Sequence, residues 1–282
     1  MQINWFPGHM KKTIDELKEK IKLCDVVLYL LDSRAPISTL NPEFKKIIEN
    51  KPIIFVLNKV DFVNLCDILA FCNKLQGENS RVVCINSTKP NSYKEIISKT
   101  QELMIKKIER NRNKGLNIPL RLLVIGVPNV GKSTLINNFA GKTKAVVGNR
   151  PGVTKSTQWV KVDNNIELLD TPGTLWPKLD NEKVAHHLAY LGSIKDEILI
   201  LSDLCYDFLE EIAPKYPVNF YERYGVRVEN KKPIEIFDEI CLSRGFILKN
   251  KEIDYERGSK AILDDYRKGK LGKIILDELN NF

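Results

Sequence analysis

The amino-acid sequence predicts an α/β fold, with a mostly parallel sheet flanked by helices and a small all-α region after it. Three observations support this prediction. Short apolar runs alternate with segments of helical periodicity over about the first 180 residues. A glycine-rich loop, Gly126 to Ser133, separates one apolar run from a helical segment. Beyond about Asn181 the strand pattern fades, whereas strand–helix alternation before it favours crossover units and a parallel sheet.

Each element follows from its pattern. Strands buried on both faces read as continuous apolar runs, and helices bring apolar residues together three or four positions apart. The predicted strands are Val26–Leu31, Pro52–Leu57, Val82–Ile85, Leu120–Ile125, Thr157–Val162 and Ile166–Leu169. The predicted helices are Asp15–Leu23, Glu43–Ile48, Phe62–Leu75, Tyr93–Glu109, Lys132–Phe139, Leu199–Ile212, Ile234–Arg244 and Asp254–Lys268. The polar, basic stretch Arg110–Pro119 is expected to be a linker.

Length, composition and charge bound the class of protein. The 282 residues leave room for one large domain and a smaller one, which we place at 1–180 and 181–282. Hydrophobic residues make up 43% and charged residues 28%, a balance typical of a folded protein. The net charge of +8 suits a phosphate-rich partner such as RNA, although many basic proteins bind none.

Two further features concern the compartment. The six cysteines form no C-x-x-C pair, so we expect reduced thiols in the core and neither disulfides nor zinc ligands. The sequence shows no signal-peptide pattern, and its longest strongly apolar run, Val26–Leu31, is too short to cross a bilayer. We therefore expect a cytoplasmic protein, a monomer, without a membrane partner.

The segment Gly126 to Ser133 matches the phosphate-binding pattern G-x-x-x-x-G-K-[ST]. Between a strand and a helix, its backbone N–H groups and the helix dipole can hold phosphate. Lys132 is expected to reach the β- and γ-phosphates as a catalytic cation, and the Ser133 hydroxyl to bind Mg²⁺. The alternative is a glycine-rich turn without a ligand. The predicted nucleotide contacts here are Asn129, Val130, Gly131, Lys132, Ser133 and Thr134.

Two segments complete the predicted phosphate site. Asp170-Thr171-Pro172-Gly173 follows a predicted strand and begins 37 residues after Ser133. Asp170 can hold Mg²⁺ through water, and the N–H of Gly173 can sense the γ-phosphate. Thr154 lies between these motifs, where its hydroxyl can complete the Mg²⁺ shell. Each segment alone could be an ordinary turn, but their order and spacing support the phosphate site.

A base-reading motif, Asn58-Lys59-Val60-Asp61, directly follows a predicted buried strand. Asp61 can accept hydrogen bonds from N1–H and the exocyclic amine of guanine, which adenine cannot offer, so the motif favours GTP and GDP. Asn58 can bond the other edge of the base, and the Lys59 stem can cover its face. The loop Asn86-Ser87-Thr88 can offer a backbone N–H to the guanine O6, or can simply cap a helix.

These motifs together resemble the translation-factor-related GTPases, but the base motif here precedes the P-loop, as in the circularly permuted GTPases. Three further segments, which begin at Asn4, Asp32 and Asp170, narrow the resemblance: NWFPGHM, DSRAP and DTPGTLWP. They are similar to the bacterial ribosome biogenesis GTPase A family (RbgA/YlqF), and the likeness covers essentially the whole chain. The resemblance implies a circularly permuted Ras-like P-loop GTPase domain followed by a helical RNA-contacting domain.

The resemblance also implies details of hydrolysis. Ras-type enzymes place a water-orienting glutamine after the glycine of Asp-x-x-Gly, whereas this chain has Thr174 and Leu175. In the family, the histidine of the Pro-Gly-His element, here His9, replaces it. His9 could equally be a surface residue that docks on RNA or caps a helix. Asn129 resembles the asparagine with which related GTPases bind K⁺, so both Mg²⁺ and K⁺ are expected cofactors.

The resemblance implies a GTPase that acts late in maturation of the large ribosomal subunit, binds its precursor through rRNA and ribosomal proteins, and leaves after hydrolysis. Low intrinsic activity, stimulated by the subunit, is expected. Two alternatives are an ATP-using enzyme such as a small-molecule kinase, and a membrane-associated or tRNA-modifying GTPase. Asp61 disfavours the first, and the lack of a long apolar helix or a C-terminal cysteine disfavours the second. Candidate phosphate contacts, or else a solvated helix face, are Arg257, Lys260, Arg267, Lys268, Lys270 and Lys273.

Replacing Asp61 by Asn tests the base-reading motif. The amide can donate to an oxygen at the position of the guanine amine, so preference should move from GTP toward xanthosine triphosphate. Competition binding with labelled GDP measures this preference, with ATP as the control nucleotide. Equal affinity of the wild-type protein for GTP and ATP would contradict the prediction.

Overall fold

The computed structural model describes residues 9–48, 51–141, 158–162, 165–176, 179 and 181–279. The chain divides into two compact units. The sheet unit contains the described residues before 179 together with 277–279, and the helical unit contains those from 179 to 276. The C-terminal residues thus belong to the sheet unit, although the predicted second domain ran to 282.

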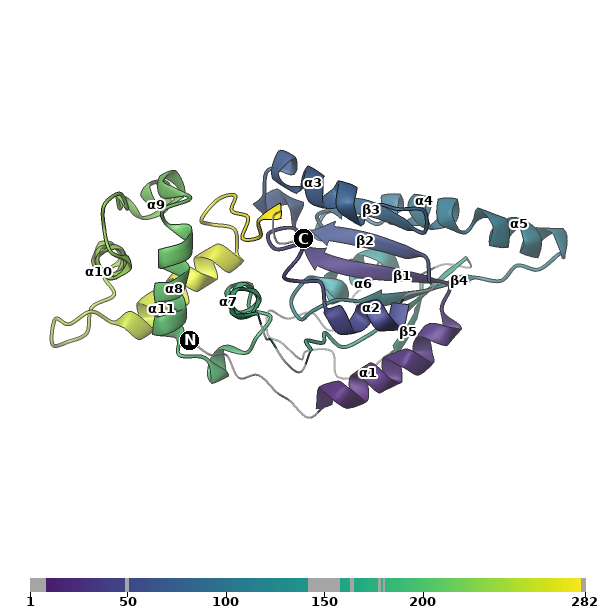
Figure 1. Cartoon of the computed structure of the whole chain (residues 1–282), viewed down its shortest axis with the longest axis horizontal. Helices are drawn as coiled ribbons and strands as arrows, with labels where there is room; N and C mark the ends of the chain where they lie inside the picture. The colour runs from purple at the N-terminus through teal and green to yellow at the C-terminus, as the bar shows by residue number, and fades with distance from the viewer. Residues whose placement is uncertain are drawn as a thin grey trace. The chain divides into compact units, whose positions relative to one another are not determined.

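The sheet unit is built on six strands in the order β3-β2-β1-β4-β6-β5 (Figure 1). Five strands run parallel, and β5 pairs antiparallel with β6 at one edge. The α/β fold class with a mostly parallel sheet is therefore confirmed. The strands are β1 Val26–Asp32, β2 Ile53–Asn58, β3 Ser80–Ile85, β4 Leu120–Ile125, β5 Gln158–Lys161 and β6 Ile166–Asp170.

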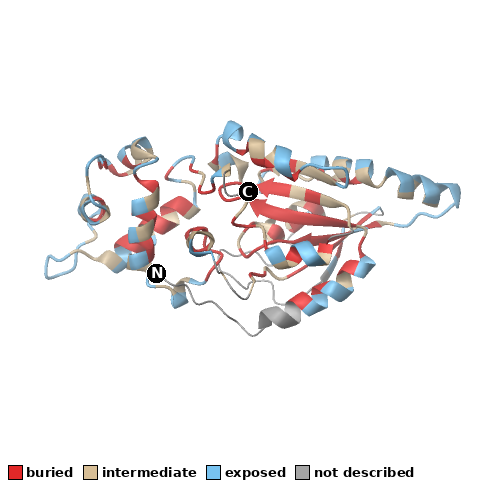
Figure 2. Cartoon of the chain, viewed as in Figure 1, coloured by how far each residue is buried: buried red, intermediate tan, exposed pale blue. Residues whose placement is uncertain are grey.

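The central strand explains why the apolar runs are continuous. Every residue of β1 is buried, because β2 and β4 flank it and helices cover the sheet (Figure 2). The chain runs outward from β1 to β3 and then returns to β4 on the other side of β1. Such a reversal of strand order leaves a crevice at the carboxyl ends of the strands, where open α/β sheets bind ligands.

Helices and short 3₁₀ turns connect these strands. One helix, α4, packs on β2 and β3, and α6 packs on β5 and β6. The helices of this unit are α1 His9–Lys20, α2 Pro42–Ile48, α3 Leu65–Leu75, α4 Lys94–Leu103, α5 Ile105–Asn113 and α6 Lys132–Ala140. The 3₁₀ turns are η1 Ile21–Leu23 and η2 Val60–Phe62.

The segment after β3 differs from its prediction. The single helix expected over Tyr93–Glu109 is broken at Met104 into α4 and α5. The linker was predicted to begin at Arg110, but α5 continues to Asn113, so the linker begins after that residue. The segment after Glu109 contains no breaker until Gly115, whose φ of +66° lies in the left-handed region that favours glycine.

The helical unit packs around α8 Leu201–Ile212, which contacts α7 Glu182–Tyr190, α10 Pro233–Arg244 and α11 Tyr255–Arg267. Three of the predicted helices match α8, α10 and α11, whereas α7 and α9 Pro217–Tyr224 were not predicted. Sequence signals for α9 were present, since Pro217 stands at its first turn and Gly225 ends it at φ +72°. The turn η3 Asp196–Ile198 lies between α7 and α8.

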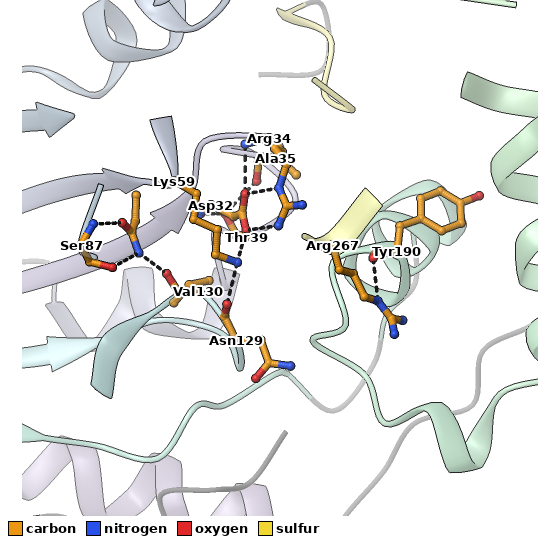
Figure 3. A network of polar contacts seen from close by, with 11 residues as sticks. Asp32, Arg34, Ala35, Thr39, Lys59, Ser87, Asn129, Val130, Tyr190 and Arg267 are labelled. Carbon is orange, nitrogen blue, oxygen red and sulfur yellow. Dashed lines mark hydrogen bonds and ion pairs between the residues drawn. The ribbon is translucent and has the colours of Figure 1, made fainter. Parts of the chain in front are cut away.

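Arg267 joins α11 to the segment before α8. Its guanidinium donates to both carboxylate oxygens of Asp196 at 2.8 Å and to the Ala189 carbonyl at 2.9 Å. It also donates to the Tyr190 carbonyl at 3.1 Å (Figure 3). The expected role of Arg267 in phosphate binding is therefore replaced by a structural one within the helical unit.

The cysteines only partly follow their prediction. Cys24, Cys205 and Cys241 are buried, but Cys66 is exposed and Cys72 and Cys84 are half-buried, with their sulfurs 3.6 Å apart. All six thiols are free. Within the described ranges, no helix has both the length and the apolar character needed to cross a membrane.

Candidate functional site

The predicted site motifs lie on loops that follow β2, β3, β4 and β6 at the carboxyl edge of the sheet (Figure 1). Parallel pairing aligns these strand ends: Asn58 is in register with Asp32 on one side and Ile85 on the other, and Asp170 with Val124. Two predicted residues fall elsewhere. Thr154 lies outside the described residues, and His9 begins α1, with nothing described of its side chain.

The P-loop has the backbone that phosphate binding requires. Asn129 and Gly131 have φ of +62° and +99°, and α6 begins at Lys132 directly after them. A Cβ added at Gly131 would lie 2.3 Å from the Asn58 side-chain nitrogen, and one at Gly126 would lie 2.6 Å from the Leu30 carbonyl. Glycine is therefore needed at both positions, for conformation and for space. Ser133 and Thr134 occupy the first turn of α6.

Lys132 closes the loop on itself. Its ammonium donates to the carbonyls of Gly126 and Val127 at 2.8 and 2.9 Å, and its side chain is buried. Burial lowers the pKa of this ammonium to about 8, and the charge of the fully buried Asp170 opposes the shift. The lysine thus presents a desolvated positive charge inside the loop, where an anion would be held more strongly than in water.

Asn58 connects three loops (Figure 3). Its amide nitrogen donates to the Ser87 hydroxyl at 3.0 Å and to the Val130 carbonyl at 2.7 Å, and its oxygen accepts the Ser87 N–H at 2.9 Å. The side chain is 1% exposed. Both donors of the amide bond protein atoms, which positions the loops, and the expected bond from Asn58 to the edge of the base stays a prediction.

Lys59 crosses from the base motif to the P-loop. It has a φ of +63°, and its ammonium donates to the Asp32 carboxylate and to the Asn129 carbonyl, both at 2.8 Å (Figure 3). Burial lowers the pKa of this ammonium, and Asp32 opposes that shift. The end of the side chain is fixed in this way between the base motif and the P-loop, and the predicted cover of a base by its stem stays a prediction.

Asp32 is the common partner of two cations. The Arg34 guanidinium bonds both its oxygens at 2.9 Å while Lys59 bonds one of them, and Asp32 and Arg34 are each 1% exposed. Burial alone would raise the pKa of the Asp32 carboxyl, but the charges of Arg34 and Lys59 hold it well below its ordinary value. Arg34 also stacks over the Phe62 ring, 5.1 Å from its centroid.

The remaining base-side residues are arranged by side-chain to backbone bonds. Asp61 lies in η2, and it is exposed. The Asn86 oxygen accepts the N–H and the hydroxyl of Thr88 at 2.9 and 2.6 Å, which closes the loop after β3. Asn138 of α6 donates to the carbonyls of Ser87 and Lys89, so the helix of the P-loop also fixes this loop.

Gly173 brings the loop after β6 against the P-loop. A Cβ at this position would lie 2.7 Å from the Cα of Pro128 and 3.0 Å from the Lys132 ammonium. Before it, the Thr171 hydroxyl donates to the Val124 carbonyl at 2.6 Å. The motifs after β4 and β6 are therefore in direct contact.

Sequence reasoning missed the contribution of three side chains. Asp32 and Arg34 were noted only as part of a family motif, and Asn138 was not noted. The sequence held a signal for Asp32 and Arg34, because an acidic residue ends the buried strand and an arginine follows two positions later. Nothing in the sequence of the α6 helix distinguished Asn138 from an ordinary polar residue.

The fold and the site define a circularly permuted P-loop GTPase, with the base motif on the second strand and the phosphate loop after the fourth. The family described as 50S ribosome-binding GTPase matches residues 121–238, so the match begins at β4 and excludes the base motif. A partial match is expected here, because the base motif precedes the P-loop in this chain and so lies before the matched residues.

Similarity to curated proteins extends over the full chain. Ribosome biogenesis GTPase A of Priestia megaterium is 40% identical over 99% of this chain and 97% of its own, and that of Thermotoga maritima is 28% identical over 96% and 93%. GNP-bound YlqF from T. maritima superposes with a TM-score of 0.65 at 25% identity, over 95% of this chain and 98% of its own. A GDP-bound YlqF structure superposes with a TM-score of 0.66 at 25% identity, over 94% of this chain and 99% of its own. The chain belongs to the ribosome biogenesis GTPase A family, and it is a GTP-hydrolysing enzyme.

Replacing Asp32 by Asn should destabilise the protein. The change leaves the buried Arg34 charge without a carboxylate, and breaking a buried ion pair in this way costs about 3–5 kcal/mol. Urea unfolding should show a loss of this size, together with weaker nucleotide binding. A variant as stable as the wild type would contradict the structural role of Asp32.

The same carboxylate predicts a pH dependence. Its folded pKa lies below the value of about 3.9 in an unfolded chain, so its contribution is full above that pH and is lost as the pH falls toward the folded pKa. Between neutral pH and about pH 3, the wild type should therefore lose more unfolding free energy than Asp32→Asn.

Replacing Gly173 by Ala should weaken binding of GTP analogues by about tenfold or more, or about 1.4 kcal/mol. The new methyl group overlaps the Pro128 backbone and forces the two phosphate-side loops apart. Titration with a non-hydrolysable fluorescent GTP analogue measures the effect. The matched control is Gly77→Ala, whose Cβ would meet a side-chain oxygen of Ser80 at 3.2 Å. Equal affinities of the two variants would show that the contact has no bearing on the nucleotide.

Proposed function

We propose that this GTPase assists late maturation of the large ribosomal subunit, binds the immature subunit in its GTP form and leaves after hydrolysis. One observation carries the proposal. Asn58 and Lys59 lock the base motif to the P-loop in a chain that matches proteins named ribosome biogenesis GTPase A over nearly their full length. The matched family is described as a 50S ribosome-binding GTPase, which supports the large subunit as the partner.

In this proposal the guanine base lies against the loops after β2 and β3. Asp61 is exposed and accepts from N1–H and the exocyclic amine. The N–H groups of Ser87 and Thr88 bond the side chains of Asn58 and Asn86 here, so one of them would exchange that bond for the guanine O6. The Lys59 stem covers one face of the base. Asn58 keeps the loops in register through Ser87 and Val130.

The phosphate side fits a triphosphate with Mg²⁺. The fully buried Asp170 carboxylate influences the pKa of Lys132, and the hydroxyl-bearing Ser133 follows that lysine, so hard oxygen donors and a cation converge on one loop. Ser133, Asp170 and Thr154 would hold the ion, which when bound neutralises charge on the β- and γ-phosphates. Lys132 orients the same phosphates, and the N–H of Gly173 donates to the γ-phosphate.

A monovalent cation belongs to the proposal as well. Asn129 has a φ of +62°, and its carbonyl accepts a bond from Lys59, which ties this residue of the P-loop to the base motif. We assign Asn129 as a K⁺ ligand on the resemblance to related GTPases, so hydrolysis should be faster in potassium than in sodium salts.

The attacking water needs an orienting group from outside the Asp-x-x-Gly loop. Thr174 and Leu175, which follow Gly173, are 2% and 0% exposed and lie in the protein interior. Neither side chain can reach solvent beside the γ-phosphate without rearrangement. We assign the role to His9, whose imidazole can accept a proton near neutral pH once the ribosomal partner has placed it.

The helical unit supplies the proposed rRNA contacts. Five of the predicted cations are exposed: Arg257, Lys260, Lys268, Lys270 and Lys273. Lys268 pairs with Asp264 on the surface at 3.1 Å, and the Arg257 guanidinium stacks over Phe246. Surface pairs of this kind are worth little in water and can be exchanged for phosphate.

Steady-state GTP hydrolysis with and without purified mature and precursor large subunits tests the proposal. The rate should rise by about tenfold or more, which corresponds to at least about 1.4 kcal/mol in the barrier. The stimulated rate should be higher in potassium chloride than in sodium chloride, and His9→Ala should remove most of the stimulation. No stimulation by either subunit would overturn the ribosomal role and leave the GTPase class intact.

A further inference from the structure

The helix α5, Ile105–Asn113, extends past the end of the sheet and has no buried residue (Figures 1 and 2). A helix of nine residues is short for stability in water, and most helices gain stability by burying an apolar face. Burial of an apolar face therefore contributes little to the stability of this helix.

Charge is the main feature of α5 and the turn that follows it. The eleven residues 105–115 contain five cations and one acid, Glu109, a net charge of +4. Lys107 pairs with Asp25. The other four cations are exposed and make no ion pair or side-chain hydrogen bond with any residue in the described part of the chain: Lys106, Arg110, Arg112 and Lys114.

Only some of these positive charges stabilise the helix. Arg112 and Lys114 lie near the carboxyl end, where positive charge suits the helix dipole. Lys106 lies in the first turn, which has no acidic residue and where positive charge is unfavourable. Lys106 and Arg110 also stand four residues apart on one face, where like charges repel. Glu109, three residues from both Lys106 and Arg112, offsets part of this repulsion, and the charge that remains favours a polyanion.

The position of α5 separates it from the nucleotide. It is part of the connection from β3 to β4 that the rotated motif order requires, and the match to the GTPase family begins only after it, at residue 121. It enters β4 at Leu120, whereas the P-loop leaves the same strand after Ile125. A partner on α5 therefore lies at the edge of the sheet opposite the nucleotide loops.

We propose that α5 and its turn form a second RNA-binding surface, which contacts the phosphate backbone through Lys106, Arg110, Arg112 and Lys114. The inference rests on the proposed ribosomal function and adds a contact in the sheet unit to those of the helical unit. Guanidinium and ammonium groups without carboxylate partners match phosphate oxygens, and contacts to the backbone carry no base specificity.

The test is a variant in which all four cations become Gln. Binding to a 20-base-pair RNA duplex of arbitrary sequence is measured across a salt series, and so is binding to purified large subunits. Loss of four phosphate contacts should weaken binding and reduce the slope of log affinity against log salt by about 3. GTP hydrolysis without subunits should be unchanged, because α5 lies away from the nucleotide loops.

The matched control removes four charges elsewhere in the sheet unit: Lys18, Lys22, Lys45 and Lys46 to Gln. Three of these lysines pair with nearby acids, Asp15, Glu19 and Glu43. The control should keep most of the affinity and of the salt slope, and thermal unfolding should show both variants folded.

Equal losses of RNA affinity in the two variants would show that only net charge matters and would overturn the inference. An α5 variant that binds RNA as tightly as the wild type would also overturn it. Preference of the wild type for anionic phospholipid vesicles over RNA would overturn it too. The RNA arm requires no ribosome. Failure of the wild type to respond to large subunits would therefore count against the proposed function, and failure confined to the α5 comparison would count against this surface alone.

Discussion

The nucleotide edge of this protein depends on one buried carboxylate. Asp32 ends the central strand and holds Arg34 and Lys59 at once, and Lys59 in turn bonds the Asn129 carbonyl of the P-loop. Without this counter-charge, the Arg34 guanidinium would be a buried unpaired charge, and burial would favour the neutral form of Lys59. The position of the base motif relative to the phosphate loop thus rests on a carboxylate that neither motif contains.

Much of the sheet could be predicted from the sequence, because strands covered on both faces must be apolar, as β1 and β2 are up to their last residues. The site was predictable as far as backbone patterns determine it, since the glycines of the P-loop are fixed by conformation and space. The partners of long side chains were not predictable. Asn58 and Arg267 carry groups suited to a ligand, yet both bond protein atoms that only the tertiary structure brings near. The break at Met104 and the helices α7 and α9 depend likewise on packing that periodicity does not record.

Thr174 and Leu175, the two residues that follow Gly173, are buried. In the proposed function, phosphate binding and charge neutralisation rest on loops that Asn58 and Lys59 already hold, whereas the group that orients water comes from outside the loop after β6. An enzyme of this proposed design would bind its nucleotide readily and hydrolyse it slowly until another molecule completes the site. Such a division suits a switch, in which the partner sets the time of hydrolysis.

The rotated order of motifs also determines how the two units are joined along the chain. The helical unit begins at 179, a few residues after Gly173, which lies against Pro128 of the P-loop. It ends at Leu276, and the next residue, Asp277, already belongs to the sheet unit. The carboxylate of Asp277 accepts the N–H groups of Ile37 and Ser38 at 2.6 and 2.9 Å and the Ser38 hydroxyl at 2.5 Å.

Ile37 and Ser38 follow Arg34 in the loop after β1, so the exit of the helical unit is tied to the loop that contains the Asp32 network, and its entry to the loop that meets the phosphates. In the proposed function, a change at either loop would reach an end of the helical unit through a few residues of covalent chain. The permutation would thereby give loss of the γ-phosphate a short path to the proposed RNA-binding unit.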